Sequence, residues 1–130
     1  MRRIWTDRVI EAPATVLWDL LTDLEQWPAW GPSLRSAVLD GRFEAGATGR
    51  LQPVVGPTLP FEITDVRPGA GWAWRVSGFD ATDHRVEPVG DDRCCVGFGV
   101  PPYLAPYLVV CAVALRRLET MATSGPARAA

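Results

Sequence analysis

The sequence contains no lysine and no asparagine, and it has only one histidine, His84. All 13 basic residues are arginines, which we interpret as the codon bias of a GC-rich genome. The formal net charge is -2 and no block of like charges occurs, so the concentrated basic surface typical of nucleic-acid-binding proteins is missing. A single histidine is also too few for the common histidine-based metal sites. We therefore expect neither a nucleic-acid partner nor a bound metal.

Cysteine is scarce as well. Cys94 and Cys95 are neighbours in the sequence, and Cys111 is the third. Neighbouring residues of a strand point to opposite faces, so this odd set does not indicate a disulfide framework, and its spacing does not resemble a zinc site. The sequence also lacks a phosphate-binding glycine loop and a serine in a nucleophile-elbow context. We expect no cofactor.

Long apolar runs are interrupted. The two arginines near the N-terminus precede no such run, so there is no signal-peptide pattern and we expect a cytoplasmic protein. The uncharged segment 96–115 reaches the length of a membrane span, but two glycines and three prolines break it. We therefore predict a strand followed by a helix in this segment, and no membrane span.

The periodicity of apolar residues predicts the order of elements. The length of 130 residues and the hydrophobic fraction of 48% suit one globular domain. Apolar spacings of three and four predict a helix over 14–24 and a long helix from Tyr103 to about Met121. Short alternating segments between Gly/Pro turns predict strands over residues 3–11, 34–40, 47–53, 59–67, 72–78, 80–88 and 93–100.

This order predicts an α+β helix-grip fold. A meander of antiparallel strands has one face to cover, and the terminal helix is the element available to cover it. We expect a curved antiparallel sheet of about seven strands around a long C-terminal helix, with one or two short helices after the first strand. The domain is expected to span residues 1–122, followed by a disordered tail over 123–130.

The hairpin over residues 80–100 predicts which side chains face inward. With a turn at 88–92, opposite charges lie across from each other on one face, which suits solvent. The other face holds His84, so this histidine is expected to point into the domain. The expected cross-strand pairs are Glu87 with Arg93, Val86 with Cys94, His84 with Val96, and Thr82 with Phe98.

His84 is the candidate catalytic residue. Its ordinary pKa suits proton transfer near neutral pH, and its ring can also donate to a ligand carbonyl. The alternative is a partly buried side chain that is hydrogen-bonded to a neighbour. If Val76 opposes Thr82 in the preceding strand pair, Trp74 lies beside His84.

The remaining candidates are expected to bind a ligand. Tyr107 lies one helical turn from Cys111. Arg8 has the same strand parity as Ile10, so an inward Arg8 would pair with a carboxylate or await an anionic ligand. Val109 lies off the buried stripe, and it either packs against a loop or marks a homodimer surface. The expected ligand-binding residues are Trp30, Trp74, Phe98, Tyr107, Cys111 and Arg8.

Several segments resemble one superfamily. The stretch IEAPATVLWDLLTD at 10–23 resembles the opening of SRPBCC proteins, which include START domains and the polyketide cyclase/dehydrase group. The segments WPAW at 27–30, VRPGAGWAW at 66–74, and the hairpin DHRVEP to RCCVGF at 83–98 are similar too. The resemblance covers about residues 4–120. It implies a deep apolar cavity between the sheet and the terminal helix, in a superfamily that shares a pocket and not a reaction.

Three functions follow as alternatives. The first is binding of a small hydrophobic or aromatic molecule, and the second is a polyketide cyclase-like enzyme that promotes aldol cyclisation and dehydration. The third is an interaction protein whose cavity is filled by its own side chains. The few inward polar groups favour binding over catalysis. An enclosed cavity of roughly 300 Å³ or more beside His84 is expected for either ligand function.

Overall fold

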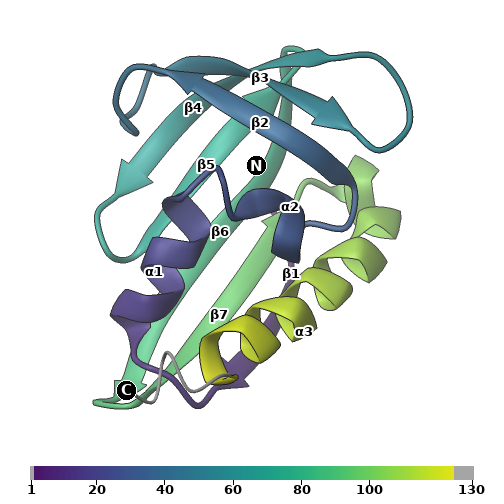
Figure 1. The fold of residues 1–130 in the computed structure, drawn as a ribbon. Coiled ribbons are helices and arrows are strands. Elements are labelled where there is room, and N and C mark those ends of the chain that lie inside the picture. The colour runs from purple at the N-terminus through teal and green to yellow at the C-terminus, as the bar shows by residue number, and fades with distance from the viewer. Residues whose placement is uncertain (1, 125–130) are drawn as a thin grey trace.

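A seven-stranded antiparallel sheet forms the body of the protein in a computed structural model that describes residues 2–124. The strands are ordered β1-β7-β6-β5-β4-β3-β2. The connection from β1 to β2 therefore links the two edges of the sheet, and every later connection joins strands that are adjacent in it. The sheet curves around the helices (Figure 1). Its strands are β1 (Ile4–Ile10), β2 (Leu34–Asp40), β3 (Thr48–Pro53), β4 (Leu59–Arg67), β5 (Gly71–Val76), β6 (Phe79–Gly90) and β7 (Arg93–Val100).

The helices lie on the concave side of this sheet (Figure 1). Helices α1 (Ala14–Thr22) and α2 (Trp27–Trp30) follow β1, and α3 (Leu108–Thr123) ends the described chain. The helix-grip prediction is confirmed. Residues 125–130, most of the predicted tail, lie outside the described residues. None of the helices within residues 2–124 has the length and apolar character needed to cross a bilayer.

The terminal helix begins later than the apolar spacing predicts. Residues Pro102–Tyr107 form a 3-10 helix, η1, and regular α-helix starts only at Leu108. Pro106 has no N–H to donate to the preceding turn, which explains why an α-helix cannot run through this segment. The buried stripe of α3 then faces the sheet and comprises Cys111, Ala114, Leu115, Leu118 and Ala122.

The predicted hairpin register is wrong by two residues. The turn between β6 and β7 is tighter than expected, with Gly90 opposite Arg93, so His84 pairs with Phe98 and not with Val96. Because the shift is even, every side chain keeps its predicted face. His84, Val86 and the other inward residues of this hairpin are buried as expected.

The register between β5 and β6 also differs from the prediction. Val76 opposes Phe79 across a turn at Ser77–Gly78, and His84 lies opposite Trp72. Both turn residues have positive φ, 52° at Ser77 and 83° at Gly78. Such a two-residue turn is shorter than the predicted one, and it brings Trp72 rather than Trp74 into register with His84.

The outer face of the sheet has one closely packed region. The Trp5 ring of edge strand β1 lies against Gly97 and Gly99 of β7. The guanidinium carbon of Arg85 lies 3.9 Å from the Trp5 ring centroid, which adds a cation–π contact. A Cβ on Gly99 would lie 2.5 Å from a ring atom of Trp5, so only glycine leaves room for the indole.

Gly99→Ala is therefore expected to destabilise the protein by about 1–3 kcal/mol, the usual result of overpacking. Urea denaturation measures this loss. Gly90→Ala is the matched control, because the nearest atom to its added Cβ is 4.0 Å away. Equal effects of the two substitutions would contradict the role assigned to the Trp5 contact.

Candidate functional site

The last turn of α1 receives its hydrogen bonds from tryptophans. The carbonyl oxygen of Leu21 accepts from Trp27 Nε1 at 2.9 Å and from Trp72 Nε1 at 3.1 Å. The carbonyl oxygen of Leu20 accepts from Trp30 Nε1 at 2.9 Å. Carbonyls at a helix end have no partner within the helix, so the three indoles satisfy them and connect α1 with α2 and β5.

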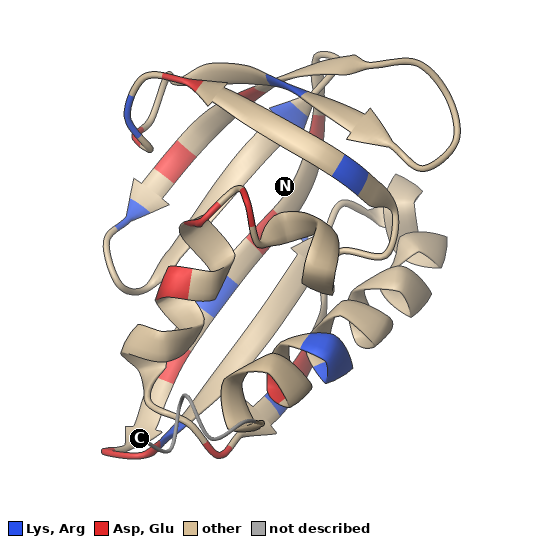
Figure 2. Cartoon of the chain, viewed as in Figure 1, with Lys and Arg blue, Asp and Glu red and all other residues tan. Residues whose placement is uncertain are grey.

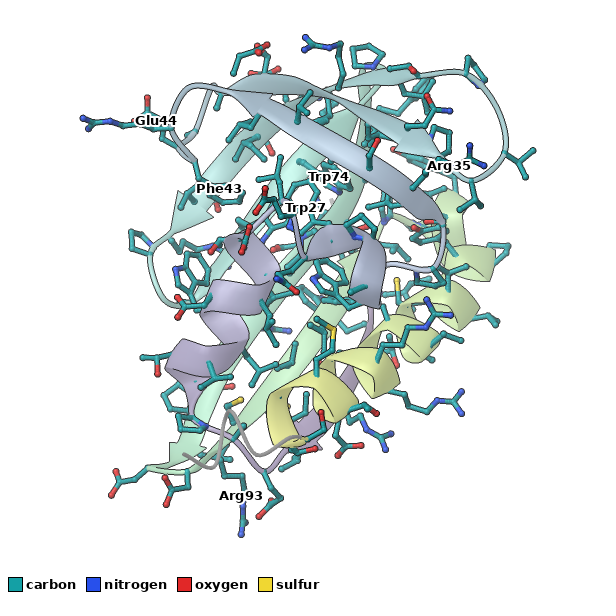
Figure 3. The ribbon with its side chains drawn as sticks, viewed as in Figure 1. Trp27, Arg35, Phe43, Glu44, Trp74 and Arg93 are labelled. Atoms are coloured by element: carbon teal, nitrogen blue, oxygen red, sulfur yellow. The ribbon has the colours of Figure 1, made fainter. Side chains whose placement is uncertain are left out.

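Aromatic rings fill the space between these elements. Trp27 stacks on Trp72 with ring centroids 5.2 Å apart, and Trp72 stacks on His84 at 3.8 Å. Trp27, Phe43 and Trp74 converge on the concave side of the sheet (Figure 3). We define the aromatic cluster as Trp27, Trp30, Phe43, Phe61, Trp72, Trp74, His84 and Phe98.

His84 is held neutral inside this cluster. Its side chain is only 3% exposed, and Nδ1 lies 3.0 Å from the carbonyl oxygen of Trp72. A carbonyl only accepts, so Nδ1 carries the proton and Nε2 carries the lone pair. Burial lowers the pKa of His84 to about 3, against the smaller raising effect of that hydrogen bond, and the charges of Arg3 and Arg67 lower it further. At neutral pH the ring is therefore a neutral imidazole and cannot act as a general acid in the imidazolium form.

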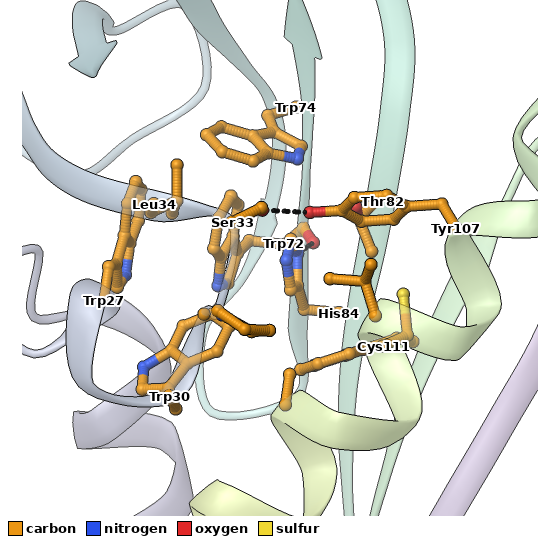
Figure 4. Close-up of a pocket in the computed structure, with 15 residues that line it drawn as sticks. Trp27, Trp30, Ser33, Leu34, Trp72, Trp74, Thr82, His84, Tyr107 and Cys111 are labelled. Atoms are coloured by element: carbon orange, nitrogen blue, oxygen red, sulfur yellow. Dashed lines mark hydrogen bonds between the residues drawn. The ribbon is translucent and has the colours of Figure 1, made fainter. Parts of the chain in front are cut away.

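A small inner pocket adjoins His84 (Figure 4). The candidates His84, Trp30, Trp74, Phe98, Tyr107 and Cys111 all line it. Its volume is about 30 Å³, far below the expected 300 Å³. This is room for only one or two water molecules, because the rings of the aromatic cluster occupy the rest. The expectation of a large enclosed cavity is wrong for this conformation.

A larger outer pocket of about 240 Å³ lies next to the inner one. Ser33, Tyr107 and three further residues line both pockets. The hydroxyls of Ser33 and Tyr107 are 2.7 Å apart and hydrogen-bonded (Figure 4). Because both residues line both pockets, this bond lies where the two pockets meet. Burial raises the pKa of Tyr107 above its ordinary value, so its hydroxyl stays protonated at neutral pH. The rest of the outer wall is mostly aliphatic: Leu34, Leu51, Pro53, Leu59, Val76, Ala81 and Leu104.

Trp74 differs from the other indoles of the cluster. It is only 8% exposed, yet its Nε1 has no hydrogen-bond partner among the described residues. In Figure 4 its nitrogen lies on the side of the ring nearest Tyr107, and Trp74 lines both the inner and the outer pocket. A buried donor without a partner is uncommon in folded proteins.

Arg8 is not part of this site. Its guanidinium bonds the carboxylate of Glu119 on α3 at 2.8 Å, its side chain is 41% exposed, and it lines neither pocket. The expectation of Arg8 as a ligand-binding residue is therefore wrong in position, although its pairing with a carboxylate was one of the two expected outcomes. The Arg8–Glu119 ion pair lies at the C-terminal half of α3, away from η1 and the pockets.

The cysteines offer no activated nucleophile. Burial raises the pKa of Cys94 and of Cys111 to about 11, so both remain thiols at neutral pH. Within residues 2–124, no three His, Cys, Asp or Glu side chains gather as metal ligands would. Charged side chains are also missing from η1 and the first half of α3 (Figure 2).

The ligand-binding residues expected from the sequence did not include Ser33, Trp27 and Trp72, all of which line the inner pocket. Ser33 lies between α2 and β2, where no periodicity indicates a direction. Trp72 shares its strand face with Trp74, and the predicted register gave that neighbour the position beside His84.

The burial of His84 predicts a loss of stability in acid. His84 binds a proton near pH 6.5 in the unfolded chain and only near pH 3 in the folded protein. Its contribution to the free energy of unfolding is therefore fully present above pH 6.5 and is lost as the pH decreases toward 3. The slope is expected to approach about 1 kcal/mol per pH unit. Urea denaturation from pH 4.5 to 7.5 measures it, and His84→Gln should remove this share of the slope. Identical slopes for the two proteins would contradict a neutral, buried His84.

The sequence and the fold were compared with known proteins. A sequence profile described as "Polyketide cyclase / dehydrase and lipid transport" matches residues 1–114. No curated protein matches the sequence.

Solved structures share the fold at low identity. The Aha1 dimer from Colwellia psychrerythraea is 18% identical, with 97% of this chain and 99% of that chain covered and a TM-score of 0.72. The Zhui aromatase/cyclase from Streptomyces sp. R1128 is 15% identical, with 93% of each chain covered and a TM-score of 0.71. Norcoclaurine synthase from Thalictrum flavum is 13% identical, covers 95% of this chain and 94% of its own, and has a TM-score of 0.67.

At these identities the structures establish the fold, and the profile match over most of the chain establishes the family. This chain belongs to the polyketide cyclase/dehydrase and lipid-transport family, within the SRPBCC superfamily.

Proposed function

We propose that the protein binds a small, neutral, largely apolar molecule in the outer and inner pockets. The observation that carries this proposal is their lining, which contains aliphatic and aromatic residues, a few hydroxyls, the neutral His84 and no charged side chain. An apolar ligand buries its surface against such walls favourably. A charged ligand would lose its hydration without gaining a partner.

The inner pocket alone is too small for such a ligand in this conformation. The outer pocket has the volume for a small aliphatic or aromatic body, and the inner one has room for a substituent. Separation of Ser33 from Tyr107 would join the two. A hydrogen bond of this kind contributes only about 1 kcal/mol net, so an open state is thermally accessible.

Binding is better supported than catalysis. A cyclase needs several groups that exchange protons with the substrate. Here His84 is a very weak base and Tyr107 is a weaker acid than an ordinary tyrosine. The cysteine thiols are also less acidic than usual. The cyclase-like activity therefore stays the second candidate, supported by the family match.

The interaction protein with a filled cavity is the third candidate. The small volume of the inner pocket supports it, because the aromatic cluster occupies the place where a ligand would sit in a wider cavity. A ligand titration separates it from the binding proposal.

Naphthalene is expected to bind saturably, whereas 2-naphthoate should bind at least tenfold more weakly because its carboxylate finds no cation in either pocket. Chemical shifts in ¹H–¹⁵N NMR spectra measure both titrations. Ala81→Phe places a ring in the outer pocket and should weaken naphthalene binding at least tenfold.

Val55→Phe is the matched control, because it adds the same ring at a position that is 85% exposed and lines neither pocket. Naphthalene affinity should be unchanged in this variant. No binding of naphthalene to the wild-type protein would reject the proposal and favour the filled-cavity alternative.

A homodimer stays a prediction. Val109 on α3 is 72% exposed, and its position off the buried stripe is the feature that suggested a dimer surface. Analytical ultracentrifugation should detect a species of twice the 14.2 kDa chain mass. Val109→Glu should dissociate it, since an unpaired carboxylate would be buried in the interface. A wild-type protein that sediments as a monomer would reject the dimer.

A further inference from the structure

One indole N–H of the aromatic cluster has no hydrogen-bond partner among the described residues. Trp27, Trp30 and Trp72 each donate an indole N–H to a carbonyl at the end of α1. Trp74 packs in the same cluster, but its N–H is buried without a partner among the described residues. Leaving a buried donor unpaired is unfavourable. The unpaired N–H of Trp74 therefore indicates an acceptor that the protein chain itself does not supply.

An acceptor on the same pocket wall complements this donor. His84 uses Nδ1 to donate to Trp72, so Nε2 presents a lone pair. The Trp74 and His84 ring centroids are 6.1 Å apart at 65°, and both residues line the inner pocket (Figure 4). The pocket thus offers one N–H donor and one nitrogen acceptor in a space of about 30 Å³.

A single neutral hydroxyl fits this arrangement. We propose that the ligand bound by the outer pocket carries a hydroxyl that enters the inner pocket, accepts from Trp74 Nε1 and donates to His84 Nε2. A carbonyl would satisfy only the tryptophan, and a carboxylate or an ammonium group would place an unpaired charge in an uncharged cavity. A water molecule would occupy the same position in the free protein, since it has the same donor and acceptor capacity.

This inference rests on the binding function proposed above and narrows its ligand to small phenols or alcohols with an apolar body. The aliphatic wall of the outer pocket would hold that body. The hydroxyl would determine which of several similarly apolar molecules binds best, because a site built for a hydroxyl leaves its polar groups unpaired with an analogue that lacks one.

The test uses 2-naphthol and 2-methylnaphthalene, which match in shape but differ in the hydroxyl. A purely apolar pocket would bind 2-methylnaphthalene more tightly, because it is the more hydrophobic of the two. We expect the wild-type protein to prefer 2-naphthol, and Trp74→Phe to weaken 2-naphthol about threefold to tenfold while changing 2-methylnaphthalene less than twofold.

Trp30→Phe is the matched control. It removes an indole from the same pocket, but that indole donates to Leu20 and not into the cavity. This variant should change the affinities of both probes by the same factor. In the wild-type protein, the Trp74 Nε1–H resonance should lie further downfield in the 2-naphthol complex than in the 2-methylnaphthalene complex, because only the first ligand gives this N–H an acceptor. This measurement needs no variant.

The outcomes separate the two proposals. Binding of both probes with an affinity ratio that Trp74→Phe leaves unchanged, or with the same Trp74 resonance for both, overturns the hydroxyl inference alone. Failure of both probes to bind overturns the proposed function as well. If Trp74→Phe does not fold, the wild-type resonance decides.

Discussion

The hydrogen bonds from three indoles to the end of α1 hold the site together. Leu21 accepts two of them and Leu20 the third, so a single helix terminus fixes tryptophans from α2 and from β5. Trp72 then stacks on His84, which orients the histidine ring and places Trp74 and Phe98 around it. Loss of these bonds would leave buried carbonyls unpaired and would release the rings that fill the cavity.

An uncharged interior follows from the same packing. The ion pairs lie on the outer face and at the edges, for instance between Arg67 and Asp83 and between Arg8 and Glu119. His84 is the only residue of the pockets with an ordinary pKa near neutrality, and burial removes its charge. The polar groups that remain are hydroxyls, one imidazole and the unpaired indole N–H of Trp74, which interact by hydrogen bonding rather than by Coulomb attraction.

The sequence was sufficient to predict the fold but not the dimensions of the site. Alternation along the strands predicted the inward face of His84, and an even register error left that face unchanged. Turn lengths were misjudged, so Trp72 and not Trp74 lies opposite the histidine. The Ser33–Tyr107 bond joins residues 74 positions apart, and no local pattern indicates it. Cavity volume depends on how large rings pack together, which periodicity does not describe.

A boundary made of two hydroxyls also has a kinetic consequence. Without charge at the pocket mouth there is no electrostatic steering, so the association rate of the proposed ligand should hardly respond to ionic strength. The rate falls further by the fraction of time that Ser33 and Tyr107 are apart. The apparent affinity of the proposed ligand would be lowered by the same fraction, because opening of this bond has to precede entry of its substituent.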